Sequence, residues 1–279
     1  KASLKGQYTL SSNFQISDLI TITLTEKPTE IGPGETLVLE GNAQKEGGKA
    51  ADGFIRLELL GDGNESIIQE GTVKNGFFNI NLSLDPETRA GKYLAKIDVY
   101  EKTAGDVKTN KGFLNYNLQI TQIPTNIEVV FETSMVEPGT MLRTKAILHD
   151  QTGENIEGST AIITIKNPKD KIMEQVEITT DEFLEFAIEN SEPPAKWKVV
   201  AVSTQLTDER TFNISEKKEV AIEIINRTLR IKNIGNVRYE DMVVVKIGGE
   251  TLNINLSLER EEEREYILSA PDGEYQVDV

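Results

Sequence analysis

The stretch Ile31-Gly-Pro-Gly-Glu-Thr-Leu37 returns as Val136-Glu-Pro-Gly-Thr-Met-Leu142, at an offset of 105 residues along the chain. Proline fixes φ and glycine accepts positive φ, so each Pro-Gly pair predicts a tight turn between two strands. Further along, Tyr93 matches Trp197 at an offset of 104 residues. A drift of one residue is expected where loops of two related domains differ in length. The chain therefore predicts two copies of one fold.

Alternation of apolar and polar residues runs through the whole chain, whereas helical periodicity is nearly absent. The clearest examples are Ile20-Thr-Ile-Thr-Leu24 and Phe78-Asn-Ile-Asn-Leu-Ser-Leu84. Such alternation gives one buried and one solvated face, as in antiparallel sheets. Turn residues that recur roughly every 8–12 positions are typical of β-sandwiches. We therefore predict an all-β fold of tandem immunoglobulin-like antiparallel β-sandwich domains.

The repeat also predicts how the chain is divided. Gly273-Glu-Tyr275 repeats the aromatic signal of Tyr93 a third time and predicts a third, shorter β unit. The segment 216–220 has neither proline nor glycine, so we expect one continuous strand at the second junction. Residues 1–18 lie outside the repeat, and we expect the last strand of an upstream domain or an added edge strand there, rather than a donor strand that completes a neighbouring subunit. The predicted segments are an N-terminal strand or linker, two sandwiches and a short third sandwich, at residues 1–19, 20–122, 123–221 and 222–279.

These motifs carry a resemblance to known families. The Pro-Gly turns, Gly76-Phe-Phe78 and Gly91-Lys-Tyr93 resemble macroglobulin-like and related bacterial or archaeal immunoglobulin-like domains. The stretch from Leu229 to Asn236, with Ala270-Pro-Asp-Gly-Glu-Tyr275, resembles CARDB-like domains. Such arrays are similar to ectodomains of archaeal or bacterial cell-surface and S-layer-associated proteins. The resemblance implies an extracellular protein that is anchored to the membrane by a C-terminal segment not included in this chain, and it brings no catalytic residues.

Charge and composition exclude several classes of protein. The chain has 46 acidic and 30 basic residues, for a net charge of −16. Nucleic acid is therefore excluded as a partner, because binding a polyanion needs clustered lysine and arginine. The absence of cysteine excludes disulfides, thiolate metal sites and cysteine nucleophiles. No apolar run approaches the roughly 20 residues that span a bilayer.

His149 is the one histidine of the chain, and Asp150 follows it. An imidazole beside a carboxylate has the chemistry of half a metal site or of a general base. No second histidine or cysteine accompanies it, so we expect a structural role in the turn that follows the strand at 142–148. We predict no catalytic residue, no metal ligand and no cofactor, and therefore no enzyme.

Acidic segments offer three further candidates. Asp62-Gly-Asn-Glu65 and Asp85-Pro-Glu87 have the oxygen ligands that Ca²⁺ prefers, but neither has the spacing of a defined calcium loop. We expect ordinary hydrated turns at both. The charge run from Glu259 to Glu265 is either a docking patch for a cationic partner or a solvated segment that protects a sheet edge, and we favour the second.

Asn-x-Ser/Thr sequons occur five times, which is more than the roughly two that chance gives at average composition. Glycosylation at such sites requires an exposed position outside the cell. The predicted glycosylation sites are Asn64, Asn81, Asn213, Asn226 and Asn255.

Together these features predict a non-enzymatic, extracellular, rod-like surface protein, such as a stalk, an adhesin or an envelope component. Its predicted partners are other surface proteins or cell-envelope glycans. One alternative is a self-assembling subunit of a surface layer or filament. A second is an accessory binding module of a secreted enzyme, which an exposed aromatic platform would favour. Trp197 does not provide such a platform, because its alignment with Tyr93 places it in a core.

Overall fold

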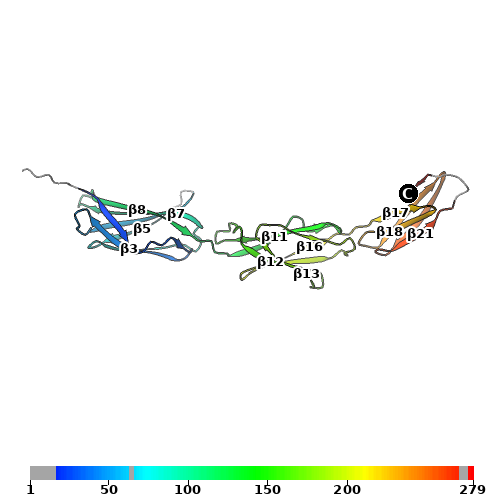
Figure 1. Cartoon of the computed structure of the whole chain (residues 1–279), viewed down its shortest axis with the longest axis horizontal. Coiled ribbons are helices and arrows are strands. Elements are labelled where there is room, and N and C mark those ends of the chain that lie inside the picture. Colours follow the sequence, from blue (N-terminus) through cyan, green and yellow to red (C-terminus); the bar gives the residue numbers. More distant parts are fainter. Residues whose placement is uncertain (1–16, 63–65, 270–275) are drawn as a thin grey trace, which may run out of the picture. The chain divides into compact units, whose positions relative to one another are not determined.

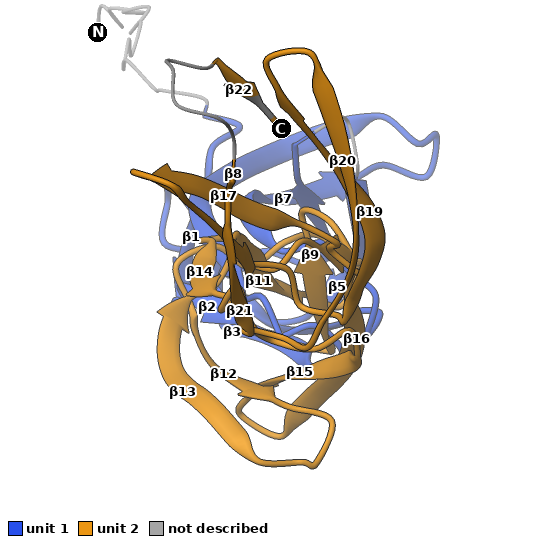
Figure 2. Ribbon diagram, turned by 90° about the vertical axis from the view of Figure 1, so that its right-hand side faces the viewer, with its two compact units in different colours: residues 1–123 blue, residues 124–279 orange. Residues whose placement is uncertain are grey.

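A computed structural model of the chain describes residues 17–62, 66–269 and 276–279. The described residues form 22 β-strands and no helix (Figure 1). The chain divides into two compact units, residues 1–123 and 124–279 (Figure 2). The first unit holds one β-sandwich and the second unit holds two.

The first sandwich packs a three-stranded sheet against a five-stranded sheet. In spatial order, the smaller sheet consists of β1 (Ile20–Leu24), β3 (Thr36–Lys45) and β6 (Phe77–Ser83). The larger sheet consists of β2 (Glu30–Ile31), β8 (Lys108–Ile120), β7 (Gly91–Lys102), β4 (Gly53–Leu60) and β5 (Ser66–Val73). Neighbouring strands are antiparallel, except that β2 runs parallel to β8.

The second sandwich repeats this arrangement. Its smaller sheet consists of β9 (Asn126–Phe131), β11 (Met141–His149) and β14 (Leu184–Ala187). Its larger sheet consists of β10 (Met135–Val136), β16 (Leu206–Ile214), β15 (Lys196–Ser203), β12 (Thr160–Lys166) and β13 (Ile172–Thr179). Strand for strand, β9 to β16 pair as β1 to β8 do, and β10 is again the parallel member. The sequence repeat is thus a structural repeat, and the predicted tandem sandwich fold is confirmed.

The third sandwich consists of two three-stranded sheets. One contains β17 (Val220–Ile225), β18 (Thr228–Asn233) and β21 (Glu263–Ile267). The other contains β20 (Glu250–Leu258), β19 (Tyr239–Ile247) and β22 (Val277–Asp278). All its neighbouring strands are antiparallel.

The Pro-Gly turns have the predicted conformation. Gly34 has a φ of 77° and Gly139 a φ of 82°, values that a glycine adopts without strain. The amide of Glu35 donates to the carbonyl of Gly32 at 3.3 Å, which closes the first turn. In the second copy, the amide of Thr140 donates to the carbonyl of Glu137 at 3.2 Å. Both turns therefore lead into the second long strand of their sandwich.

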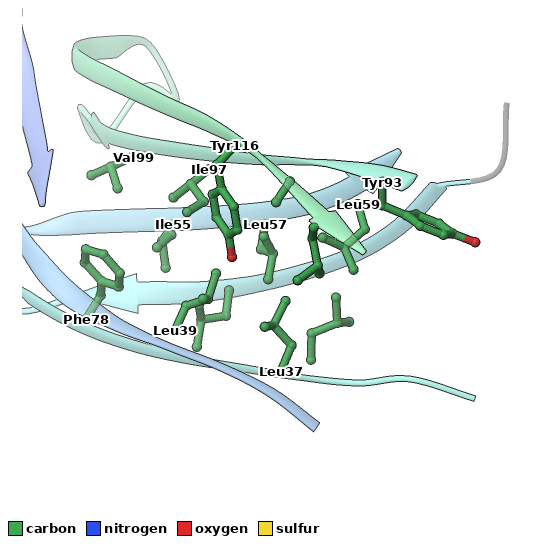
Figure 3. Packing of buried hydrophobic residues seen from close by; sticks show 14 of the residues in the cluster. Leu37, Leu39, Ile55, Leu57, Leu59, Phe78, Tyr93, Ile97, Val99 and Tyr116 are labelled. Atoms are coloured by element: carbon green, nitrogen blue, oxygen red, sulfur yellow. The ribbon is translucent and has the colours of Figure 1, made fainter. Parts of the chain in front are cut away.

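Alternation buries one face of each strand. In β3, for example, every second residue is buried, including Leu37, Leu39 and Ala43. The buried side chains form three hydrophobic clusters, one in each sandwich. Figure 3 shows the first, in which leucine, isoleucine and aromatic side chains fill the space between the two sheets. Tyr93 and Trp197 both belong to these cores, as predicted, whereas Tyr275 lies outside the described residues.

The second junction differs from the prediction. β16 ends at Ile214 and β17 begins at Val220, so residues 216–220 are not one continuous strand. The backbone between them bonds instead to the loop after β18: Ile234 and Asn236 donate their amides to the carbonyls of Glu219 and Lys217. Because these groups are paired with a loop, they do not extend a sheet. The predicted segment boundaries near 19, 122 and 221 stay predictions.

Candidate functional site

Three aromatic side chains lie on the outer face of the larger sheet of the first sandwich. Phe54 on β4 and Tyr100 on β7 are register partners, and their rings stack at 5.7 Å between centroids with an interplanar angle of 27°. Phe113 on β8 lies two residues from Lys111, the partner of Tyr100, and therefore occupies a diagonal position on the same face. Phe113 is 75% exposed and Phe54 is 44% exposed. We call these three residues the aromatic patch.

Two lysines accompany the aromatic patch. The Nζ atom of Lys108 lies 4.2 Å from the centroid of the Tyr100 ring. The Nζ atom of Lys102 lies 5.5 Å from the rings of both Phe54 and Tyr100, and 3.3 Å from the carboxylate of Asp106. Cations held at the faces of exposed rings stabilise the arrangement by cation–π attraction and leave N–H donors at its border.

The chemistry of the aromatic patch is that of a binding surface. Exposed rings offer apolar area at low entropic cost, and the lysines offer hydrogen bonds to hydroxyl or anionic groups. The sequence prediction missed the patch, because it looked for a platform only at tryptophan. Phe54, Tyr100 and Phe113 occupy the outward positions of their strands, where polar residues are usual. An aromatic residue at an outward position of an alternating strand is therefore the sequence signal that identifies these three residues.

His149 and Asp150 form hydrogen bonds around the turn after β11. His149 is the last residue of β11, one position before the turn in which we expected it. Its Nδ1 atom lies 3.2 Å from the carbonyl of Gly153, and its Nε2 atom 3.5 Å from the carboxylate of Glu128. Asp150 is buried, and its Oδ1 atom accepts the amides of Thr152 at 2.8 Å and Glu154 at 3.1 Å. These bonds, with one from the Thr152 hydroxyl at 2.8 Å, organise the turn after β11.

Of the two acidic loops, only the second lies fully within the described residues. Residues 63–65, which include most of the first loop, lie outside them. In the second loop the Oδ1 atom of Asp85 accepts the amide of Glu87 at 2.8 Å, as in an ordinary Asx turn. Within residues 17–62, 66–269 and 276–279, no group of three histidine, aspartate or glutamate side chains has the geometry to hold a metal ion.

The charge run from Glu259 to Glu265 is largely neutralised within its own sandwich. The Glu262 carboxylate accepts the Glu259 amide at 2.7 Å and an Arg264 N–H at 2.9 Å. The backbone hydrogen bond from Glu259 and the guanidinium of Arg264 lower the pKa of Glu262. Arg230 on the neighbouring strand pairs with Glu263 and Glu265, both at 2.8 Å. The run is thus an exposed segment with internal ion pairs, as in the interpretation that we favoured, and whether it also docks a cationic partner stays untested.

Four of the five predicted glycosylation sites lie in the described residues, and Asn64 does not. Asn81 on β6 and Asn255 on β20 are exposed on the outer faces of their sheets. Asn226 is exposed at the turn between β17 and β18, with a φ of 57°. Asn213 on β16 is half-buried. Their use as glycosylation sites stays a prediction.

The fold defines the class: the chain is a tandem array of immunoglobulin-like β-sandwiches, and the aromatic patch lies on the first of them. No helix among the described residues has the length and apolar character to cross a membrane. No protein-family model matches the chain, and no curated protein matches it in sequence.

Several solved structures are similar to it in fold. A Salmonella alpha-2-macroglobulin is 12% identical over 93% of this chain, with a TM-score of 0.29, and the match spans 21% of that protein. The FN1–FN3 domains of chicken CNTN1 are 9% identical over 92% of this chain and 90% of theirs, with a TM-score of 0.39. The amphioxus IgVJ-C2 molecule is 14% identical over 67% of this chain and 99% of its own, with a TM-score of 0.30.

Proposed function

We propose that this chain is a non-enzymatic extracellular surface protein, in which tandem sandwiches space and present binding surfaces. The role is that of a rod-like stalk, an adhesin or an envelope component, and its attachment to a membrane is through a C-terminal segment outside this chain. Other surface proteins or cell-envelope glycans are the proposed partners. The aromatic patch is the single observation that carries the binding role, because exposed rings bordered by cations are unusual on the outer face of a sheet.

Among these partners the aromatic patch favours glycans. A sugar ring presents an apolar C–H face that stacks on an aromatic side chain, while its hydroxyl groups hydrogen-bond to the lysines. The net charge of −16 favours neutral or weakly charged glycans over strongly anionic ones.

Replacing Phe113 tests this proposal. We expect Phe113→Ala to weaken binding to purified cell-envelope polysaccharide roughly tenfold, since central aromatic contacts commonly contribute more than 1 kcal/mol. Affinity electrophoresis in gels containing the polysaccharide measures the change. Phe77→Ala is the matched control, because Phe77 is 50% exposed on the smaller sheet of the same sandwich and lies outside the patch. Equal losses from the two variants, or no retardation of the unaltered chain, contradict a glycan role for the patch.

The aromatic patch also favours an accessory binding module of a secreted enzyme as a second function. Such a module binds the substrate of its enzyme rather than the envelope of its own cell. Retention on insoluble cellulose, chitin or starch, without retention on envelope polysaccharide, would support this alternative over the surface role.

A further inference from the structure

Three polar side chains meet at one end of the first sandwich, where the strand pattern would place apolar ones. On β3, Lys45 takes the inward position that follows the buried Ala43. On β7, Glu101 takes the inward position that follows the buried Val99. The third side chain is that of Asn110 on β8. Lysine and glutamate at inward positions are unusual unless they are paired, so this cluster calls for an explanation.

A β-bulge directs Asn110 toward Glu101. The register between β7 and β8 shifts between Tyr100 and Lys102, so Glu101 alone lies opposite residues 109 and 110 of β8. A bulge of this kind changes the direction in which a side chain points. The irregular pairing of these two strands is therefore what brings the carboxamide to the carboxylate.

The carboxylate of Glu101 contacts both of the other groups. The Nζ atom of Lys45 lies 2.9 Å from Oε1 and 3.2 Å from Oε2 of Glu101. The Nδ2 atom of Asn110 donates to the same Oε2 atom at 2.5 Å. The Glu101 side chain is 13% exposed and the Lys45 side chain 31% exposed. Partial removal from water disfavours the charged forms, which makes proton transfer between the two groups easier.

We propose that Lys45 and Asn110 form an amide bond between their side chains once the first sandwich has folded, with Glu101 as the proton carrier. The bond from Nζ of Lys45 to Cγ of Asn110 forms, and the bond from Cγ to Nδ2 breaks. The ammonium group of Lys45 gives up two protons, which pass through the carboxylate to Nδ2, so the nitrogen of Asn110 leaves as ammonium. Glu101 begins and ends the step as a carboxylate, and the step consumes no other reactant.

The fold supplies the proximity that this reaction needs. A free amine and a carboxamide react very slowly in water, but well-oriented groups within one molecule reach effective concentrations of roughly 10⁵–10⁸ M. Each chain reacts once, and the ammonium ion can leave because the site is only partly buried. The product links β3 of the smaller sheet to β8 of the larger sheet, so the two layers of the sandwich become covalently joined.

The second sandwich provides an internal comparison. The repeat offset of 105 residues aligns Lys45 with Asp150. The Asp150 carboxylate accepts the backbone amides of Thr152 and Glu154 and has no nucleophilic amine to offer. The proposed bond is therefore specific to the first sandwich, and one bond is expected for each chain.

Mass spectrometry of the purified full chain tests the proposal. We expect the intact chain to be about 17 Da lighter than its sequence, because one ammonia is lost. Digestion with trypsin locates the bond. The peptide that contains Lys45 is expected to be uncut after this residue and joined to Thr109–Lys111, and the unbranched peptide Thr109–Lys111 is expected to be absent.

Variants of the three groups assign their roles. Lys45→Arg, Glu101→Gln and Asn110→Ser are each expected to restore the full sequence mass, whereas Asn115→Ser, at an exposed position of β8, keeps the deficit. Hydrogen exchange of the β4 amides verifies that all four variants remain folded. Lys45→Arg retains a cation beside Glu101 but has no amine that can react. In that background, Glu101→Gln reports on the hydrogen bonds and the charge alone.

Three results would overturn the proposal. The first is the full sequence mass in the folded, unaltered chain, together with the unbranched peptide. The second is a deficit that maps to a cyclic imide at Asn75-Gly76, because this also releases ammonia. The third is a joined peptide that persists in Glu101→Gln. The proposal does not depend on the glycan-binding role, and Phe113→Ala is expected to keep the mass deficit.

Discussion

Gly235 lies between Asn233 and Asn236, the two buried asparagines of the third sandwich. The Asn236 side chain accepts the amide of Lys217 at 2.7 Å and donates to the carbonyls of Glu192 and Ser215. Asn233 donates to three carbonyls and accepts the amide of Gly235 at 2.9 Å. These side chains thus pair backbone groups that no sheet pairs, and glycine lets the chain approach closely enough to do so.

We expect Gly235→Ala to destabilise the third sandwich by about 2–4 kcal/mol, as overpacking against backbone does. A Cβ atom there would lie 2.1 Å from the carbonyl oxygen of Lys217 and 2.9 Å from the amide nitrogen of Glu219. Both atoms are backbone, so a side-chain rotation cannot relieve the overlap. Exchange of the buried β18 amides measures the loss.

Gly249→Ala, in the same sandwich, is the control for this prediction. No atom of a surrounding residue lies within 4 Å of the place that a Cβ atom of residue 249 would occupy. Its effect is expected to stay within about 0.5 kcal/mol. Similar losses in the two variants would show that the close approach at Gly235 is unimportant.

Among the strands of the first sandwich, Glu101 near the end of β7 connects this strand with β3, with β8 and with the loop before β4. Its carboxylate accepts hydrogen bonds from Lys45 of β3 at 2.9 Å, from the amide of Asp52 at 3.0 Å, and from Asn110 of β8 at 2.5 Å. Burial raises the pKa of Glu101, but these hydrogen bonds and the charge of Lys45 outweigh it, so the pKa lies below its usual value of 4.5.

This pKa predicts how the stability of the first sandwich depends on pH. A carboxyl with a lowered pKa in the folded state stabilises the fold above its unfolded pKa, and this contribution is lost as the pH falls through the folded pKa. Glu101→Gln is therefore expected to cost about 1 kcal/mol at pH 7 and progressively less below pH 4.5.

Urea unfolding monitored through the NMR signals of β7 measures both effects. Glu46→Gln, at the exposed residue after Lys45, is the control and should leave the stability at pH 7 unchanged. An unchanged cost of Glu101→Gln at pH 3 would contradict the assigned cause.

At the scale of the whole molecule, the spacing role requires a monomer, and the self-assembly alternative requires oligomers. We expect a mass of 31.0 kDa by light scattering at every concentration in a dilution series. Sandwiches joined end to end, with strands of about 10 residues at ~3.3 Å each, would elute as an elongated particle of about 100 Å. The mass is expected to be the same with and without Ca²⁺, because the described acidic side chains do not converge on a metal site.

Growth of the mass with concentration would favour a surface layer or filament over a stalk. Growth that needs Ca²⁺ would show that the acidic loops bind the ion. In either case the segment 1–19 is the first to delete, because it was predicted as a strand or linker outside the repeat.

Local physics made much of this protein predictable from its sequence. Alternation determined which face of each strand is buried, since successive side chains point to opposite sides of a strand. Pro-Gly pairs determined the turns at Gly34 and Gly139, because they favour the required backbone angles in any context. The sequence repeat aligned Tyr93 with Trp197, and both side chains lie in the hydrophobic cores of their sandwiches.

Tertiary structure alone decided the properties that depend on which strands are neighbours. The aromatic patch exists because the register brings Phe54, Tyr100 and Phe113 from three strands to one face. Residues 216–219 do not belong to a strand, because the loop after β18 forms hydrogen bonds with their backbone. Alternation reports only the two faces of a strand, whereas the edge is decided by what other segments of the fold supply.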